Sequence, residues 1–185
     1  MTQGHTYGEL TKITDSTCLV EGEIHKPCLN CEYVHVEYLE KPEHKFVYVE
    51  SADLEICEIC QAMKYNGHIY AIFTDISDWY AAKSHCEDRG GYLATVTSSD
   101  ELEAMKRYMG YTSKATDVWI GAYKENNVWN WVSGEKFEFS NWDPYEPNDV
   151  DGYEYYIEMN HTYFGGWNDE DFDVENNYFC EWEAE

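Results

Sequence analysis

The sequence has few positive charges. Only 12 of its 185 residues are Lys or Arg, against 37 Asp or Glu, so its formal net charge is −25. Such a surface repels phosphate groups, which excludes nucleic acid and makes anionic membranes poor partners. An excess of carboxylates is what hard cations such as Ca²⁺ require. Acidic loops that only keep a protein soluble would give the same composition, so charge alone leaves both interpretations open.

Long hydrophobic runs are also missing. No apolar stretch reaches the roughly 18 to 20 residues that a membrane span needs, so we expect no membrane insertion. No basic stretch followed by an apolar one marks a signal peptide. Acids are plentiful, but none stands in a recognisable catalytic context, so we expect no enzyme. Hydrophobic residues make up 43% and aromatic residues 17% of the chain, which is enough for a packed core.

The seven cysteines are unevenly distributed. Five lie in the first third of the chain, whereas Cys86 and Cys180 lie far apart in the rest. The pattern of residues changes at Asn66-Gly67, which is a turn signal. We therefore predict two domains: a small β-rich, cysteine-rich module over residues 1–66 and a larger domain over residues 67–185.

Two Cys-x-x-Cys pairs stand out in the first module. Cys28 with Cys31 and Cys57 with Cys60 would give a tetrahedral thiolate zinc site, as in zinc ribbons. A metal is a natural staple for a module too small to fold on its core alone. Disulfide bonds and redox catalysis are the alternatives, and the long gap between the pairs leaves them open. A different metal set is open as well: His5, Cys18, Cys28 and Cys31.

Residues 67–185 show two helices followed by strands and loops. Ser77 or Asp78 can cap a first helix, which Gly90-Gly91 would end. Ser98-x-x-Glu101 is a capping box that opens a second helix. Short aromatic stretches then alternate with polar loops to the end of the chain. This order predicts an α+β fold.

Five oxygen-bearing side chains in the later loops are candidate calcium ligands. They are Glu146, Asn148, Glu154, Asn168 and Asp169. Calcium takes six to eight oxygens from carboxylates, amides and carbonyls, which this set can supply. A cis peptide bond before Pro147 would turn both flanking carbonyl groups toward one point. Cis peptide bonds are essentially confined to bonds that precede a proline, so this one is permitted. Acidic loops with Pro and Asn are common, so residue types alone do not decide.

Residues 67–185 contain a series of short motifs. They are Asp78-Trp79-Tyr80-Ala81-Ala82-Lys83-Ser84-His85-Cys86, Gly90-Gly91-Tyr92-Leu93-Ala94, Trp119-Ile120-Gly121, Trp129 and Trp131 before Gly134, Asn141-Trp142, Trp167-Asn168-Asp169 and Phe179-Cys180-Glu181. In this order and at these spacings they resemble the C-type lectin-like domain. The resemblance implies a fold of two helices, antiparallel sheets and long loops, with the tryptophans in its core.

The resemblance also implies calcium-dependent carbohydrate binding. In this family Glu146-Pro147-Asn148 is the tripeptide that marks mannose-type sugars, and the swapped Gln-Pro-Asp form favours galactose. Its two side chains, Glu154 and the Asn168-Asp169 pair would bind one principal calcium, and two neighbouring sugar hydroxyls would complete the shell. The expected partners are glycans with mannose, glucose, N-acetylglucosamine or fucose, bound on the order of millimolar as single sugars. Oligomers would supply avidity, and the implied location is secreted or at the cell surface.

The auxiliary calcium site of the family is incomplete in this sequence. It would need acids where this chain has Ala122 and Asn126, and Tyr155 stands where many relatives carry an acid. Asp149 is the one residue that fits. We therefore expect one calcium ion.

The disulfide pattern of the family is also only partly present. The resemblance implies a long-range bond between Cys86 and Cys180. Tyr156 and Phe172 occupy the positions of the family's inner disulfide, where we expect an aromatic contact instead.

A related domain that binds protein without sugar recognition is the alternative. Retention of all five ligand types favours the sugar-binding interpretation, because a drifting site should lose them first.

Overall fold

The computed structural model describes residues 5–112, 117–160 and 166–184, which form two compact units. One contains Met1–Lys45 and Glu58–Cys60, and the other contains Phe46–Cys57 and Gln61–Glu185. The predicted domain boundary at residues 66/67 falls inside the second unit. The strands on either side of that turn form one continuous ladder, in which Met63 pairs with Tyr70, Lys64 with Ile69 and Tyr65 with His68.

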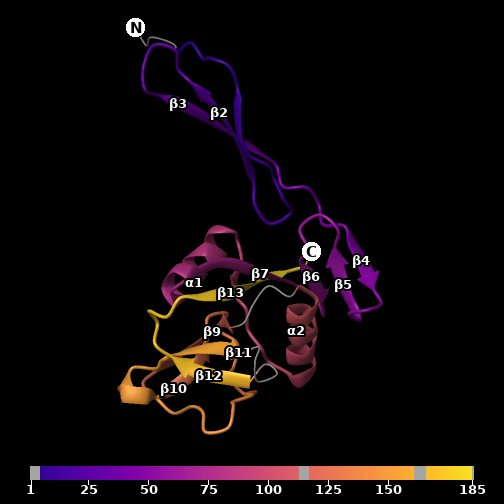
Figure 1. The fold of residues 1–185 in the computed structure, drawn as a ribbon, viewed down its shortest axis with the longest axis vertical. Helices are drawn as coiled ribbons and strands as arrows, with labels where there is room; N and C mark the ends of the chain where they lie inside the picture. Colours follow the sequence, from indigo (N-terminus) through magenta and orange to yellow (C-terminus); the bar gives the residue numbers. More distant parts are fainter. Residues whose placement is uncertain (1–4, 113–116, 161–165, 185) are drawn as a thin grey trace. The chain divides into compact units, whose positions relative to one another are not determined.

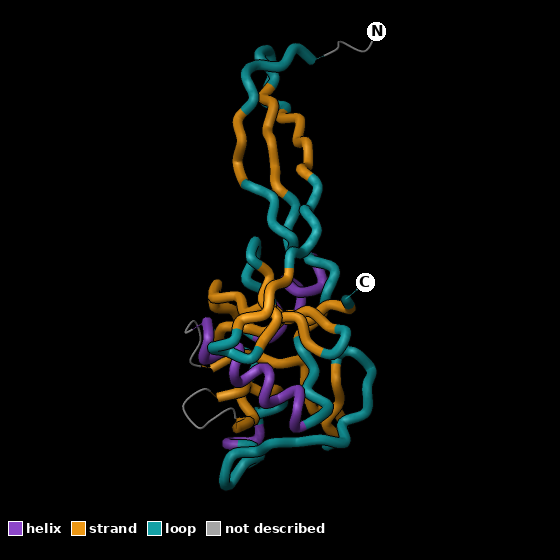
Figure 2. The backbone as a smooth tube through the Cα atoms, turned by 90° about the vertical axis from the view of Figure 1, so that its right-hand side faces the viewer, coloured by secondary structure: helices purple, strands orange, loops and turns teal. Residues whose placement is uncertain are grey.

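The first unit is a small antiparallel sheet. Its strands are β1 (Thr11–Thr14), β2 (Gly22–Pro27) and β3 (Val34–Leu39), in that order across the sheet. Figures 1 and 2 show these strands joined by long loops. Among its described residues, the only buried hydrophobic side chains are those of Cys18 and Leu19. The unit is therefore β-rich, as predicted, but it has almost no apolar core.

The second unit is built on one large sheet. In chain order its strands are β4 (Phe46–Val49), β5 (Leu54–Cys57), β6 (Met63–Tyr65), β7 (His68–Ser77), β8 (Tyr92–Leu93), β9 (Asp117–Glu125), β10 (Val128–Trp131), β11 (Tyr156–Asn160), β12 (Gly166–Glu170) and β13 (Asn176–Glu183). The main order across the sheet is β12-β11-β9-β13-β7-β6-β5-β4, with β10 on β9 and β8 on β13. The last strand, β13, therefore lies between β7 and β9 and closes the domain (Figure 1).

The two helices lie between β7 and β9 in the chain, with β8 between them. Helix α1 (Trp79–Asp88) is capped by Asp78, whose carboxylate accepts the Ala81 N–H at 2.8 Å. Helix α2 (Ser99–Thr112) begins with the predicted box, in which Ser98 Oγ accepts the Glu101 N–H at 3.2 Å. In the usual capping box this carboxylate accepts the N–H of the cap residue itself, whereas the Glu101 carboxylate accepts the Thr97 N–H at 2.7 Å. The predicted helices and the α+β fold are confirmed.

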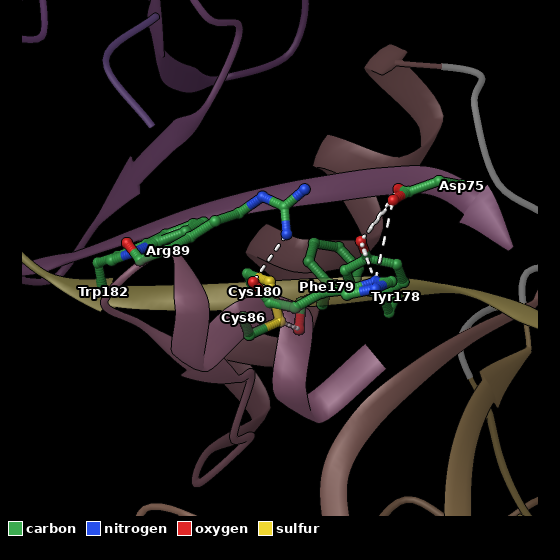
Figure 3. The surroundings of a disulfide bond; sticks show 8 residues. Asp75, Cys86, Arg89, Tyr178, Phe179, Cys180 and Trp182 are labelled. Atoms are coloured by element: carbon green, nitrogen blue, oxygen red, sulfur yellow. Dashed lines mark hydrogen bonds and ion pairs between the residues drawn. A yellow bond between two sulfur atoms is a disulfide. The ribbon is translucent and has the colours of Figure 1, made fainter. Parts of the chain in front are cut away.

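A disulfide joins α1 to β13 inside the core. Cys86 and Cys180 are both fully buried, and their Cα atoms lie 5.4 Å apart (Figure 3). Beside it Trp182 donates its indole N–H to the Arg89 carbonyl at 3.0 Å. The predicted long-range pairing is confirmed, and it connects the first helix of the unit to its last strand.

The tryptophans and the glycine of the short motifs have structural roles. Trp79 donates to the Ile120 carbonyl and Trp119 to the Ser77 carbonyl, each at 3.0 Å, so these rings are core residues with satisfied donors. At Gly121 a Cβ atom would lie 2.3 Å from the Leu93 carbonyl oxygen, so only glycine allows this approach. No helix in the described part of the chain is long and apolar enough to span a membrane.

Candidate calcium site

The candidate ligands come from one long loop and one strand of the second unit. Glu146, Asn148 and Glu154 lie between β10 and β11, and Asn168 and Asp169 lie on β12. Strand β11 pairs with β12 directly after the loop, in a register that sets Ile157 opposite Asp169. The peptide bond between Glu146 and Pro147 is cis. The ladder therefore brings the returning loop to the strand that carries the last two candidates.

Asp169 attaches the loop to the strand. Its side chain is fully buried, and its two carboxylate oxygens accept the backbone N–H groups of Asn148 at 2.9 Å and Asp149 at 3.0 Å. Both bonds reach some twenty positions along the chain, so they are tertiary contacts. The buried carboxylate thus fixes the backbone next to the Glu-Pro-Asn tripeptide.

Glu146 has one oxygen without a hydrogen-bond donor. Oε1 accepts from the Asn148 side-chain amide at 2.8 Å. Oε2 is buried and has no hydrogen-bond partner among the described residues. Burial, followed by the direct approach of the Asp169 carboxylate and then by its charge, raises the pKa of Glu146 above its ordinary value. A buried carboxylate oxygen that lacks a donor and faces another carboxylate is the environment that a bound cation would relieve.

Glu154 shares this negative environment. Its side chain is buried and accepts the Val150 N–H at 2.6 Å. Burial is the main cause that raises the pKa of Glu154, and the charges of Asp169 and Glu170 add to it. These carboxylates repel one another, and a cation bound between them would relieve that repulsion. Their oxygens are hard donors, which calcium requires, so the residues present fit the ion.

Asn168 is held by a different set of carboxylates. Its amide nitrogen donates to Glu158 at 3.2 Å and to Glu170 at 3.5 Å. Glu158 also accepts from the Asn176 amide at 2.6 Å, and burial raises the pKa of Glu158 to about 7. Sequence reasoning did not identify Glu158. The available signal was an acid between the apolar residues Ile157 and Met159 of a short strand, where an ionised side chain is costly if it is buried.

A lysine lies where a second cation would need acids. The Lys124 ammonium pairs with the Asp149 carboxylate at 2.9 Å and lies 5.7 Å from the centre of the Trp129 ring. This pair holds the pKa of the Asp149 carboxyl below its ordinary value. The one acid that suited an auxiliary calcium therefore already has a cationic partner, which the sequence analysis did not foresee.

Aromatic side chains fill the position of the missing inner disulfide. The rings of Tyr156 and Phe172 are 6.5 Å apart and meet edge to face. The Tyr80 ring contacts both, at 5.5 Å from Tyr156 and 5.7 Å from Phe172. The expected aromatic contact is present, enlarged by a third ring from α1.

The predicted zinc ligands fall into separate groups. Cys28 and Cys31 lie together with His5, with one ligand atom of each within 4.8 Å of the others. Cys60 lies with Cys18 and His44 within the same limit. The first group contains three of the four members of the alternative set of the sequence analysis, and Cys18 belongs to the second.

Relatives of this chain are found both in sequence and in structure. A family profile described as Lectin C-type domain matches residues 76–182. Asialoglycoprotein receptor 1 of Mus musculus is 32% identical over 93 residues, which cover 49% of this chain and 31% of the receptor. E-selectin of Homo sapiens is 34% identical over 108 residues, which cover 55% of this chain and 17% of the selectin. The chain thus spans a third or less of the length of these two relatives.

Solved structures show the same fold. The C-type lectin CEL-I from Cucumaria echinata has a TM-score of 0.62 at 26% identity, covering 67% of this chain and 96% of that one. The mouse scavenger receptor C-type lectin carbohydrate-recognition domain has a TM-score of 0.60 at 26% identity, with the same coverage. Because the profile match covers more than half of the chain and the fold agrees, this protein belongs to the C-type lectin domain family.

Proposed function

We propose that the second unit is a calcium-dependent lectin of mannose-type specificity, and not an enzyme. The proposed ligands of its single calcium ion are Glu146, Asn148, Glu154, Asn168 and Asp169. The observation that carries the proposal is the buried Oε2 atom of Glu146, which has no hydrogen-bond partner among the described residues and lies beside the charge of Asp169. A cation held by these oxygens would satisfy both carboxylates.

The side chains of the tripeptide would read the sugar. A bound calcium ion supplies two coordination positions that neighbouring sugar hydroxyls can fill. Each hydroxyl can then donate to a carboxylate oxygen of Glu146 or Glu154 and accept from an amide N–H of Asn148 or Asn168. The order of Glu146 and Asn148 along the chain decides where donors and acceptors lie. Mannose, glucose, N-acetylglucosamine and fucose present hydroxyl pairs that suit this order.

The surroundings of the site suggest a weak, shallow contact. Tyr145 is 94% exposed and Tyr153 is 65% exposed, so they are available at the surface but enclose nothing. His161 could also contact a bound sugar, but it lies outside the described residues. With few further contacts a single sugar should bind on the order of millimolar, and useful affinity would come from several sites acting together. Such multivalent binding suits a secreted or surface-displayed protein.

One calcium ion is proposed, and not two. The position of an auxiliary ion would include Asp149, whose carboxylate pairs with Lys124 at 2.9 Å. A second divalent cation bound there would lie close to an ammonium group, which would repel it. The other two positions hold Ala122 and Asn126, so no further acid offsets this repulsion.

A glycan array probed with and without free calcium tests the function. The expected result is binding to mannose-, fucose- or N-acetylglucosamine-terminated glycans in calcium and none in a calcium chelator. The matched control is Asp151→Asn, which removes an exposed acid from the same loop and should bind as the unaltered chain does. Binding that persists unchanged in the chelator would contradict the proposal and favour the alternative, a domain that recognises protein.

A further inference from the structure

The first unit contains two clusters of zinc-type ligands that the lectin function does not use. The His44 cluster consists of Cys18, His44 and Cys60, and the His5 cluster consists of His5, Cys28 and Cys31. In each cluster one ligand atom per residue lies within 4.8 Å of the others. Thiolate sulfur and imidazole nitrogen are the ligands that zinc prefers.

Backbone contacts assemble the His44 cluster from three loops. The Glu58 N–H donates to the Lys45 carbonyl at 2.9 Å, and the Lys45 ammonium pairs with the Glu58 carboxylate. These bonds place His44 beside the turn of Cys60, where His44 Nδ1 is 3.4 Å from the Cys60 sulfur. The Cys18 sulfur is 3.7 Å from the carbonyl oxygen of Glu43, the residue before His44.

The Cys-x-x-Cys spacing supplies a fourth ligand to the His44 cluster. Cys57 stands three residues before Cys60 in the chain. This is the spacing with which one turn of backbone presents two thiolates to the same zinc ion. With Cys57 the set has three sulfurs and one nitrogen, which is a complete tetrahedral shell for a structural zinc ion.

The His5 cluster shows the hydrogen bonding of a metal-binding turn. The Asn30 N–H is directed at the Cys28 sulfur at 3.5 Å, and the Cys31 sulfur is 3.5 Å from His5 Nδ1. The chain at His5 is held in place because the Leu29 N–H donates to the Thr6 carbonyl at 2.8 Å. Three protein ligands leave a fourth position open, to which water can bind.

The weak core of the first unit gives the metals a structural purpose. Cys18 and Leu19 are its only buried hydrophobic residues in the described part, while Leu29 is 65% exposed and Tyr38 is 64% exposed. A unit of this size without a core needs cross-links to be ordered. Binding of zinc to thiols releases their protons and couples the free energy of binding to folding.

We propose that the cysteine-rich part of the chain, residues 5–60, binds two zinc ions, one at each cluster. The ligands alternate along the chain: His5 for one ion, Cys18 for the other, Cys28 and Cys31 for the first, then His44, Cys57 and Cys60 for the second. Each ion thereby ties together segments that are far apart in sequence. This assignment separates the two Cys-x-x-Cys pairs, which a single four-thiolate site would combine.

Zinc counting on single variants of the full chain tests the assignment. The chain is purified without added metal and without chelator, and zinc per chain is measured by mass spectrometry. Two zinc ions are expected in the unaltered chain, one in Cys31→Ser and one in His44→Ala. His25→Ala is the matched control, because His25 pairs with Glu23 outside both clusters and should leave two ions bound.

The contrary results are equally definite. One zinc ion that both Cys31→Ser and Cys60→Ser remove would show a single shared site and overturn the proposal. One ion that only the Cys60 variant removes would overturn the His5 site. No zinc, together with alkylation showing four of the five cysteines oxidised, would replace both sites by disulfides. Titration of the unaltered apoprotein with Co²⁺ guards against variants that fail to fold: saturation of the thiolate absorption at two equivalents supports two sites, and at one equivalent refutes them.

Discussion

Replacing Glu146 by Gln should affect stability differently with and without calcium. In the calcium-free protein the Gln carbonyl can still accept from the Asn148 amide, a bond of 2.8 Å in the unaltered chain. The new amide nitrogen replaces the buried Oε2 atom, for which the described part of the chain offers no hydrogen-bond partner. The substitution also removes the repulsion with Asp169 that contributes to the raised pKa of Glu146. The free energy of unfolding without calcium should therefore stay constant or rise.

In saturating calcium the same substitution should be destabilising. A ligand that binds only the folded state adds RT ln(1 + [L]/Kd), which is about 2.7 kcal/mol at a calcium concentration of 100 Kd. For a unit of this size that corresponds to a rise in Tm of roughly 10 °C. Loss of one charged ligand weakens calcium binding, and a fall of about 100-fold would leave a gain of about 0.4 kcal/mol.

Thermal unfolding followed by near-ultraviolet circular dichroism measures both effects. The unaltered chain and the Glu146→Gln and Asp151→Asn variants are compared over a calcium titration. Asp151→Asn should keep the full calcium-dependent rise in Tm. The reasoning is refuted if Glu146→Gln retains that rise, since the carboxylate would then not bind the ion. It is also refuted if the variant loses as much stability without calcium as with it, because Glu146 would then be structural.

Three further predictions follow from the second unit. Exchanging Glu146 and Asn148 for Gln and Asp should move the ranking on a glycan array toward galactose, and an unchanged ranking would contradict the proposed reading of the hydroxyls. Replacing Cys86 and Cys180 by Ala should cost about 4 to 5 kcal/mol in urea unfolding, from closure of a loop with a sequence separation of 94; a loss under 1 kcal/mol would show that the bond is dispensable. The pKa of Glu158 is about 7 in the folded chain and about 4.5 in the unfolded chain. As the pH rises from the lower to the higher of these values, the unfolded chain loses this proton first, which lowers the stability of the calcium-free fold by about 3 kcal/mol. Glu158→Gln should flatten this part of the stability–pH profile, and an unchanged slope would exclude Glu158 as its cause.

The sequence predicted the second unit well where local signals and long-range packing agree. Asp78 and Ser98 are cap residues with one dominant use, and both cap helices in the structure. Gly121 is needed because a side chain would meet the Leu93 carbonyl. The resemblance supplied the pairing of Cys86 with Cys180, which no local pattern could have given.

The remaining features depend on contacts between residues that no short pattern links. The pairing of Lys124 with Asp149 spans 25 positions and joins a strand to a loop, so it appears only when the chain is folded. His44 has no ligand-like spacing to either Cys-x-x-Cys pair, and it lies next to Cys60 through folding contacts such as that of Glu58 with Lys45. The predicted domain boundary missed that β5 and β6 continue the large sheet, because a turn at Asn66-Gly67 is equally suited to a hairpin within one domain.

The two proposed kinds of metal site should not exchange their ions. Carboxylate and amide oxygens such as those of Glu146 and Asp169 suit calcium, whereas the sulfur and imidazole ligands around His44 suit zinc. Millimolar calcium should therefore leave the zinc content unchanged, and calcium should still raise the Tm of the fully zinc-loaded chain. Displacement of zinc by calcium would show that both ions compete for the acidic loops, and would remove the chemical basis for assigning the cysteines to a separate metal.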